Sequence, residues 1–240
     1  MKKTVKKIIK TLSCIVVVFV LLIIVYLALL MWGFEKSSDY YYSEAQKLEN
    51  EGKYKEAIEL LDKAIEENPQ NIYALMNRAV DKSLLGDYEG AIEDYSRIIK
   101  IDERNTLAFL NRGMSKAELK DYKGAIEDYD KGIETKGGEF MYFEKAENSF
   151  INSGYEFDAL MEELRFERGF ARTDIGMFRG AFDDFNFCIQ KNFYLSTSYY
   201  MLGVIYIENE HIDEACEMFA KAKELGNSEA QGKIDVYCKK

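Results

Sequence analysis

The sequence contains two nearly identical decapeptides, GDYEGAIEDY at residues 86–95 and KDYKGAIEDY at residues 120–129. The copies differ only at their first and fourth letters and are offset by 34 residues. Each copy ends in an acidic pair followed by a tyrosine, Glu93–Asp94–Tyr95 and Glu127–Asp128–Tyr129. These carboxylates either form a catalytic site or only reflect an internal repeat of the chain.

The 34-residue period extends in both directions from these decapeptides. In every frame the eighth residue is small, the twentieth is alanine, and the seventeenth and twenty-fourth are large and apolar. A glycine marks a turn between the two halves at Gly52, Gly86 and Gly176, whereas Lys120 and Glu210 occupy that place in the other two frames. The predicted repeats are 38–71, 72–105, 106–139, 162–195 and 196–229.

These columns predict pairs of short antiparallel helices. Small residues at positions eight and twenty allow two helix backbones to approach closely, and the residues at seventeen and twenty-four fill the space between successive hairpins. One hairpin cannot bury its apolar face alone, so the hairpins stack. We expect an all-α solenoid over residues 35–240. Residues 140–161 form an insertion, which a degenerate repeat would also explain, and residues 230–240 form a capping helix.

The segment GKYKEAIELLDKAIEENPQN at residues 52–71 resembles the tetratricopeptide repeat family, with Pro69 at the proline position of that family. Later frames depart from it there. The resemblance implies a helical-hairpin solenoid that binds proteins or peptides on a concave groove. The first helix of each hairpin would line this groove through positions two, five, six, nine and twelve.

Those positions identify the candidate binding residues. Asn77 and Asn111 recur one repeat apart, and an asparagine amide can bond both N–H and C=O of an extended peptide. Inter-helix packing explains them nearly as well. A carboxylate clamp, known in some members of the family, is not expected, because only one of its five positions matches here. The candidate groove residues are Tyr73, Met76, Asn77, Val80, Leu107, Leu110, Asn111, Met114, Phe166, Phe170 and Tyr200.

The N-terminal segment reads as a membrane anchor. Residues 11–34 are uncharged, and the 18 residues from Ile15 to Trp32 would span about 27 Å as a helix at roughly 1.5 Å per residue. A cleavable signal peptide fits less well, because the apolar run is long and no small-x-small site follows it. Residues 1–10 contain five lysines, so the positive-inside rule predicts a cytoplasmic N-terminus and an extracytoplasmic body.

The remaining chain is strongly acidic. Subtracting those five lysines from the 32 basic residues leaves 27, against 42 acidic residues. A body of this charge is a poor candidate for nucleic-acid binding.

The sequence offers no catalytic constellation. Adjacent helix residues point about 100° apart, so the acidic pairs do not converge on one atom. We expect them, and the similar pair Asp183–Asp184, on a solvated outer face. His211 is the only histidine, so neither a His-based triad nor a multi-histidine metal site is expected. We therefore expect a non-enzyme without metal or cofactor.

The cysteines are few. Cys216 and Cys238 lie on either side of the Gly226–Asn227 turn, so antiparallel helices would bring them abreast. They form either a disulfide or a pair of small buried apolar groups. With three body cysteines, one is expected to stay free or buried.

Together these features predict a non-catalytic, membrane-tethered scaffold that binds a protein or peptide. An accessory subunit of an envelope assembly or secretion machine, and a homo-oligomeric structural element, are the alternatives.

Overall fold

The computed structural model describes residues 18–24, 37–135 and 157–238. Residues 18–24 are helical and exposed. Within the described residues, no helix combines the length and apolar character needed to cross a membrane. Apart from residues 18–24, the predicted anchor (11–34) lies outside the described part, as do the basic tail (1–10) and most of the predicted insertion (140–161).

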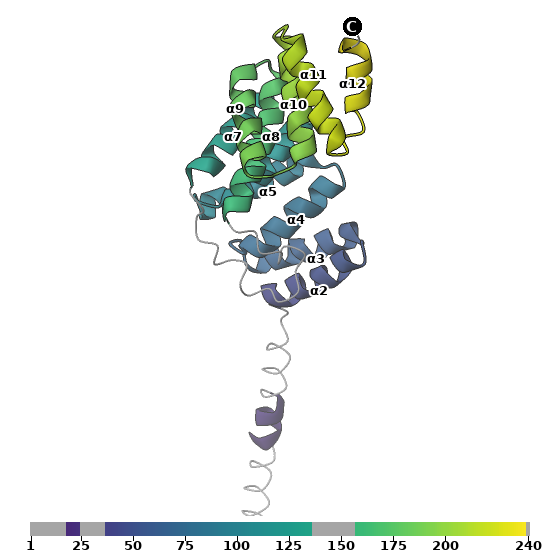
Figure 1. Cartoon of the computed structure of the whole chain (residues 1–240). Helices are drawn as coiled ribbons and strands as arrows, with labels where there is room; N and C mark the ends of the chain where they lie inside the picture. The colour runs from purple at the N-terminus through teal and green to yellow at the C-terminus, as the bar shows by residue number, and fades with distance from the viewer. Residues whose placement is uncertain (1–17, 25–36, 136–156, 239–240) are drawn as a thin grey trace, which may run out of the picture.

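The described body is a stack of helical hairpins, and the predicted all-α solenoid is confirmed (Figure 1). The hairpins follow one another in chain order from α2 and α3 to α10 and α11, with α12 packed on α11. The first helices are α2 (Ser38–Asn50), α4 (Ile72–Leu84), α6 (Thr106–Glu118), α8 (Phe157–Asp174) and α10 (Leu195–Glu208). The second helices are α3 (Tyr54–Glu67), α5 (Tyr88–Ile101), α7 (Tyr122–Glu134), α9 (Phe178–Gln190) and α11 (Ile212–Glu224), and α12 spans Ala230–Tyr237.

The turn within each hairpin requires a left-handed residue. Gly52, Gly86 and Gly176 adopt φ values of 73°, 82° and 74°. Lys120 and Glu210 adopt 62° and 64° at the same position, so the backbone conformation persists without glycine. A side chain in this conformation costs about 1 kcal/mol relative to glycine.

The core forms where the two helices of a hairpin approach. The alanines at position twenty are fully buried, and each large residue at position twenty-four is at most 2% exposed. In the third repeat a Cβ on Gly113 would lie 2.5 Å from the Tyr129 ring, and in the fifth a Cβ on Gly203 would lie 2.6 Å from the Phe219 ring. Position eight is therefore small because the ring at position twenty-four of the same hairpin lies over it. The side chains at position seventeen are less buried than expected, because Tyr54 is only half-buried and Ile212 is exposed.

The prediction that the acidic pairs lie on a solvated face is wrong for one member of each pair. Glu93, Glu127 and Asp183 are exposed, but Asp94, Asp128 and Asp184 are at most 3% exposed. Each buried aspartate accepts bonds from an arginine 16 residues earlier and pairs with a lysine or arginine 12 residues earlier, which ties the two helices of its hairpin together. These ion-paired clusters, here named the Asp–Arg ladder, are Arg78–Lys82–Asp94, Arg112–Lys116–Asp128 and Arg168–Arg172–Asp184.

The ladder also joins successive hairpins, because each of its arginines reaches position twenty-five of the preceding repeat. Arg78 Nη1 lies 2.6 Å from Asp62 Oδ1, and Arg112 Nη1 donates to Ser96 Oγ over 3.0 Å. The first and fifth repeats have apolar residues at the aspartate position, Leu60 and Met218, so the ladder occupies the three central repeats.

The stack continues across the predicted insertion. Helix α8 packs on α7 in the same way that α4 packs on α3. Arg168 Nη1 lies 2.6 Å from Asp130 Oδ1, and Leu164 lies against Gly132. The fourth repeat therefore stacks directly on the third, and residues 157–161 of the predicted insertion are the start of α8.

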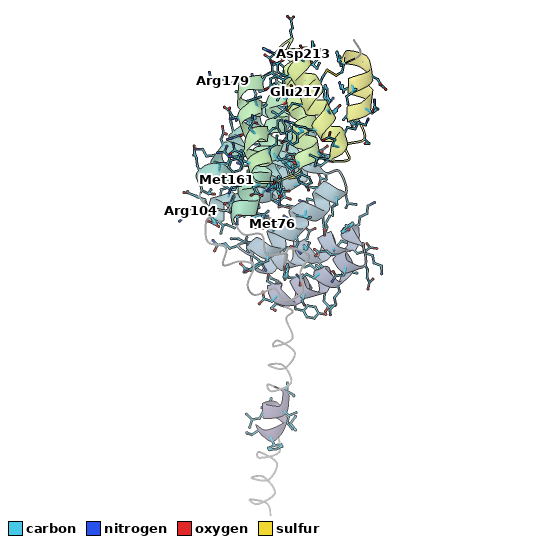
Figure 2. The ribbon with its side chains drawn as sticks, in the orientation of Figure 1. Met76, Arg104, Met161, Arg179, Asp213 and Glu217 are labelled. Atoms are coloured by element: carbon cyan, nitrogen blue, oxygen red, sulfur yellow. A yellow bond between two sulfur atoms is a disulfide. The ribbon has the colours of Figure 1, made fainter. Side chains whose placement is uncertain are left out.

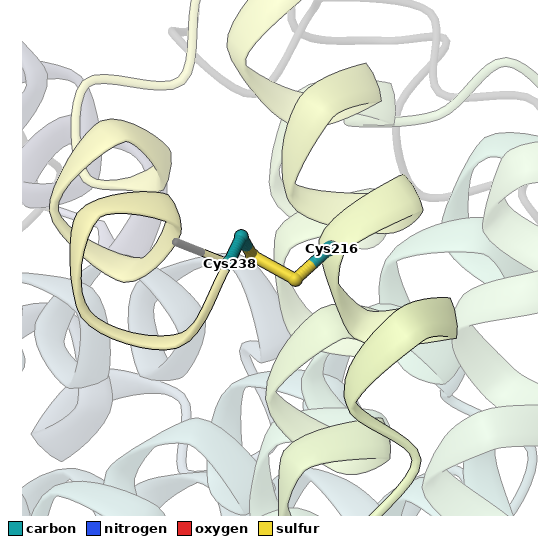
Figure 3. Close-up of a disulfide and its surroundings, with 2 residues drawn as sticks. All are labelled: Cys216 and Cys238. Carbon is teal, nitrogen blue, oxygen red and sulfur yellow. A yellow bond between two sulfur atoms is a disulfide. The ribbon is translucent and has the colours of Figure 1, made fainter. Parts of the chain in front are cut away.

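A disulfide joins Cys216 on α11 to Cys238, the residue directly after α12 (Figure 3). The two Cα atoms are 5.7 Å apart. Of the two arrangements that the sequence allows for these residues, the structure has the bridge. Cys188 is free and fully buried, and burial raises its pKa to about 12.

Candidate functional site: the first-helix face

The surface formed by positions two, five, six, nine and twelve of the first helices is named here the first-helix face. Neighbouring first helices are in contact along it. The rings of Tyr42 and Tyr73 lie 6.1 Å apart between α2 and α4. Ser83 Oγ lies 3.4 Å from Ser115 Oγ between α4 and α6. The face is therefore continuous over the first three repeats.

The predicted groove residues divide by depth. Met114 is the most open, at 38%. Met76 (labelled in Figure 2), Leu110 and Phe166 belong to the core, so they support the face from beneath instead of lining it, which corrects their predicted role. The half-buried members are Tyr73, Val80, Leu107, Asn111, Phe170 and Tyr200.

The two repeated asparagines have different environments. The Asn77 amide nitrogen donates to both carboxylate oxygens of Glu49, at 3.1 and 2.9 Å. The Asn111 amide nitrogen lies 3.8 Å from Met76 Sδ. Asn77 is 6% exposed and its Oδ1 has no hydrogen-bond partner. Asn77 thus links α4 to α2 and retains one free acceptor.

Asp81 lies beside this pair. It is 3% exposed and its Oδ2 has no hydrogen-bond partner. Burial, together with the nearby charge of Glu49, raises the pKa of Asp81 to about 7. Burial also raises the pKa of Glu49, partly opposed by its bond to Asn77. Glu49, Asn77 and Asp81 are named here the first acidic site.

A second group of carboxyls lies further along the face, between α6 and α8. Burial, followed by the charges of Glu163 and Glu118, raises the pKa of Glu167 to about 7. Burial alone raises the pKa of Glu163. The hydroxyl of Tyr129, near Glu167 and Glu118, is buried without a partner. Glu118, Glu163 and Glu167 are named here the second acidic site.

Three of these five carboxyls lie at positions that the repeat pattern assigns to the first-helix face. Glu163 and Glu167 occupy positions two and six of the fourth repeat, and Glu49 occupies position twelve of the first. The predicted list took the apolar residues of the fourth repeat and omitted its acids. Asp81, at position ten, lies outside the family columns and was missed for that reason.

Protonation of Asp81 is expected to couple stability to pH. Its pKa is higher in the folded protein than the ordinary value of 3.8, so the folded state binds more protons, and its contribution is lost as pH rises from about 4 to 7. Asp81→Asn is therefore expected to raise the unfolding free energy at pH 8 by about 2 kcal/mol and by less at pH 5. Denaturant unfolding at both pH values measures this.

The matched control for this substitution is Glu93→Gln, which removes an exposed carboxylate from α5. It should leave the unfolding free energy unchanged within about 0.5 kcal/mol at both pH values. A loss of stability in Asp81→Asn at pH 8 would contradict the assignment.

Among the described residues, no group of three or more His, Cys, Asp or Glu side chains is placed to hold a metal ion. His211 is exposed at the start of α11, 3.4 Å from Glu214.

The fold resembles several solved structures at low identity. YrrB, described as a TPR protein with an unusual peptide-binding site, matches with a TM-score of 0.67 and 18% identity over 87% of this chain and 97% of that chain. MamA from Desulfovibrio magneticus RS-1 matches with a TM-score of 0.65 and 16% identity over 80% and 96%. PilF from Pseudomonas aeruginosa matches with 0.58 and 17% over 79% and 76%. At these identities the likeness shows the fold.

A sequence search among curated proteins gives no match. Family models described as tetratricopeptide repeat match residues 38–71, 107–137 and 196–226. These segments coincide with α2–α3, α6–α7 and α10–α11, and the hairpins between them have the same small-residue and ring columns. Three of the five hairpins therefore match the tetratricopeptide repeat, and the described body has the fold of a tetratricopeptide-type solenoid.

Proposed function

We propose that this protein is a non-catalytic, membrane-tethered scaffold that binds a peptide segment of another protein on its first-helix face. The main support is the pair of buried acceptors, Asn77 Oδ1 and Asp81 Oδ2, that have no hydrogen-bond partner among the described residues. Native proteins seldom leave such atoms unpaired, so a ligand that supplies donors stabilises them. The similar YrrB structure, described as having a peptide-binding site, supports the same role.

The tether and its orientation rest on the sequence. The uncharged run of residues 11–34 follows five lysines, which favours a cytoplasmic N-terminus and a body outside the cytoplasm. The Cys216–Cys238 disulfide agrees with that placement, because disulfides persist in oxidising compartments. A tethered face also has a raised effective concentration for partners in the same membrane.

A photo-crosslinking residue at Met114 tests the binding role. Met114 is exposed on α6 near the middle of the face, so irradiation of intact cells should couple the chain to a distinct partner band. The same residue at Glu93, exposed on the second helix α5, is the control and should give no such band. Equal crosslinking from both positions, or none from Met114, would contradict binding on the first-helix face.

A further inference from the structure

The first acidic site contains two unpaired acceptors and no positive charge. Asn77 and Asp81 are each more than nine-tenths buried, and each has an oxygen without a hydrogen-bond partner. None of the ion pairs among the described residues includes Glu49 or Asp81. A buried acceptor without a donor costs about 1–3 kcal/mol, so this site stores a penalty that a suitable ligand removes.

The cations of the same helices are already engaged elsewhere. Arg78 and Lys82, on α4 with Asp81, bond to Asp94 on the opposite side of the hairpin. The equivalent cations of the third repeat, Arg112 and Lys116, bond to Asp128. The protein's own ladder therefore uses the nearby cations, and these acids have no ion-pair partner among the described residues. A cationic ligand would supply that partner.

The geometry favours an ammonium over a guanidinium. Both oxygens of Glu49 already accept from Asn77, so Glu49 does not present a free carboxylate edge for the two parallel bonds of an arginine fork. The acceptors of the site, on Glu49, Asn77 and Asp81, are spread over three different side chains. A lysine ammonium is a compact charge with three N–H donors, which matches three separate acceptors.

The second acidic site repeats this chemistry further along the same face. Glu118, Glu163 and Glu167 are absent from the ion pairs of the described residues. The buried Tyr129 hydroxyl beside them has no partner. The first site lies between α2 and α4 and the second between α6 and α8, so two first-helix spacings separate them.

We propose that the first-helix face binds an extended peptide with two lysines about six residues apart, one at each acidic site. Packed helices lie about 8–10 Å apart, so two spacings correspond to roughly 16–20 Å. An extended chain covers about 3.3–3.6 Å per residue, so the two lysines would be separated by five or six positions along the peptide. The inference rests on the proposed peptide-binding function and specifies the class of peptide.

The probe is a capped, dye-labelled heptapeptide with lysine at its first and seventh positions and alternating leucine and serine between them. Its partner peptide has norleucine in place of both lysines, which keeps the apolar stem and removes the charge. Binding to the full-length chain in neutral detergent is measured by fluorescence anisotropy at pH 8. The lysine peptide should bind at least tenfold more tightly than the norleucine peptide.

The protein variant is the double substitution Glu49→Gln and Asp81→Asn, which removes two charges from the first acidic site. This variant should bind the lysine peptide at least tenfold more weakly, and its affinity for the norleucine peptide should not change. The control is Glu93→Gln with Glu127→Gln, which removes the same charge from exposed positions on the second helices and should leave both peptides unchanged. Circular dichroism confirms that both variants are folded.

Three outcomes would overturn the inference. The lysine peptide does not bind the unmodified chain, or it binds no better than the norleucine peptide, or the control variant weakens it as much as the site variant does. Any of these together with a partner crosslinked at Met114 leaves the proposed function standing and removes only the lysine specificity. Absence of that crosslink removes the function itself.

Discussion

Asp184→Ala is expected to destabilise the protein by about 3–5 kcal/mol, because it leaves buried charges without their partner. Asp184 is fully buried and accepts from Arg168 Nε at 2.9 Å and from Arg172 Nη1 at 2.7 Å. Removing its carboxylate deprives both guanidinium groups of their main acceptor. Arg168 itself is 9% exposed, so water cannot replace the lost contacts fully. Denaturant unfolding followed by circular dichroism measures the change.

Asp183→Ala is the matched control, since it removes the same group from the adjacent, exposed position. Its expected cost is within about 0.5 kcal/mol. A second variant, Asp184→Asn, retains one acceptor oxygen and should lie between the two. If Asp183→Ala and Asp184→Ala unfold at the same denaturant concentration, the Asp–Arg ladder contributes nothing to stability.

Loss of the Cys216–Cys238 disulfide is the second large expected effect. The bridge closes a segment of the chain with a sequence separation of 22 residues, and the chain-entropy model gives about 3 kcal/mol for a loop of this size. Among the described helices, α12 packs extensively only against α11, and much of it is exposed, including Val236 at 70%. The double variant Cys216→Ser, Cys238→Ser should therefore lose amide hydrogen-exchange protection in α12.

The effect should stay local, because in a stacked-repeat protein each hairpin contacts only its neighbours. Exchange protection in α4 and α5 is the internal control and should not change. Treating the unmodified chain with reductant should reproduce the loss, whereas reductant should not affect the double variant. Unchanged protection of α12 in both cases would show that the disulfide does not hold this helix.

The sequence predicts the fold well because the two helices of each hairpin pack so closely that only small residues fit at one position of every repeat. A side chain at Gly113 or Gly203 would overlap a buried ring, so small residues recur there and reveal the hairpin. The break in the 34-residue period after the third repeat conceals the fact that the third and fourth hairpins are in direct contact. Asp130 and Arg168 are 38 residues apart yet form the same contact that Asp62 and Arg78 form at 16, so the stack resumes after residues 136–156.

The acidic pairs show where pattern reasoning failed. The helix period correctly separates Glu93 from Asp94, but it does not say which direction is buried. Burial of Asp94 depends on Arg78, 16 residues earlier on another helix. The same offset recurs between Arg112 and Asp128, so comparing offsets between opposite charges would have found the ladder.

The candidate site was only partly predictable for a related reason. Asn77 stands out because it recurs at position six, but its bond to Glu49 depends on how α4 lies against α2. Asp81 lies at a position whose occupants vary from repeat to repeat, including Ser115 and Ala171, so no column indicates it. Its unusual protonation follows from burial beside Glu49, and burial of a polar residue is visible only once the helices are packed.

The ladder has a consequence for the order in which the repeats stack. Position twenty-five alternates between Asp62, Ser96 and Asp130 along the stack. If the fourth hairpin docked on the second, with the third excluded, Arg168 would face Ser96 and lose an ion pair with a 2.6 Å separation. The difference in charge at this one column therefore favours docking of the fourth hairpin on the third over docking on the second.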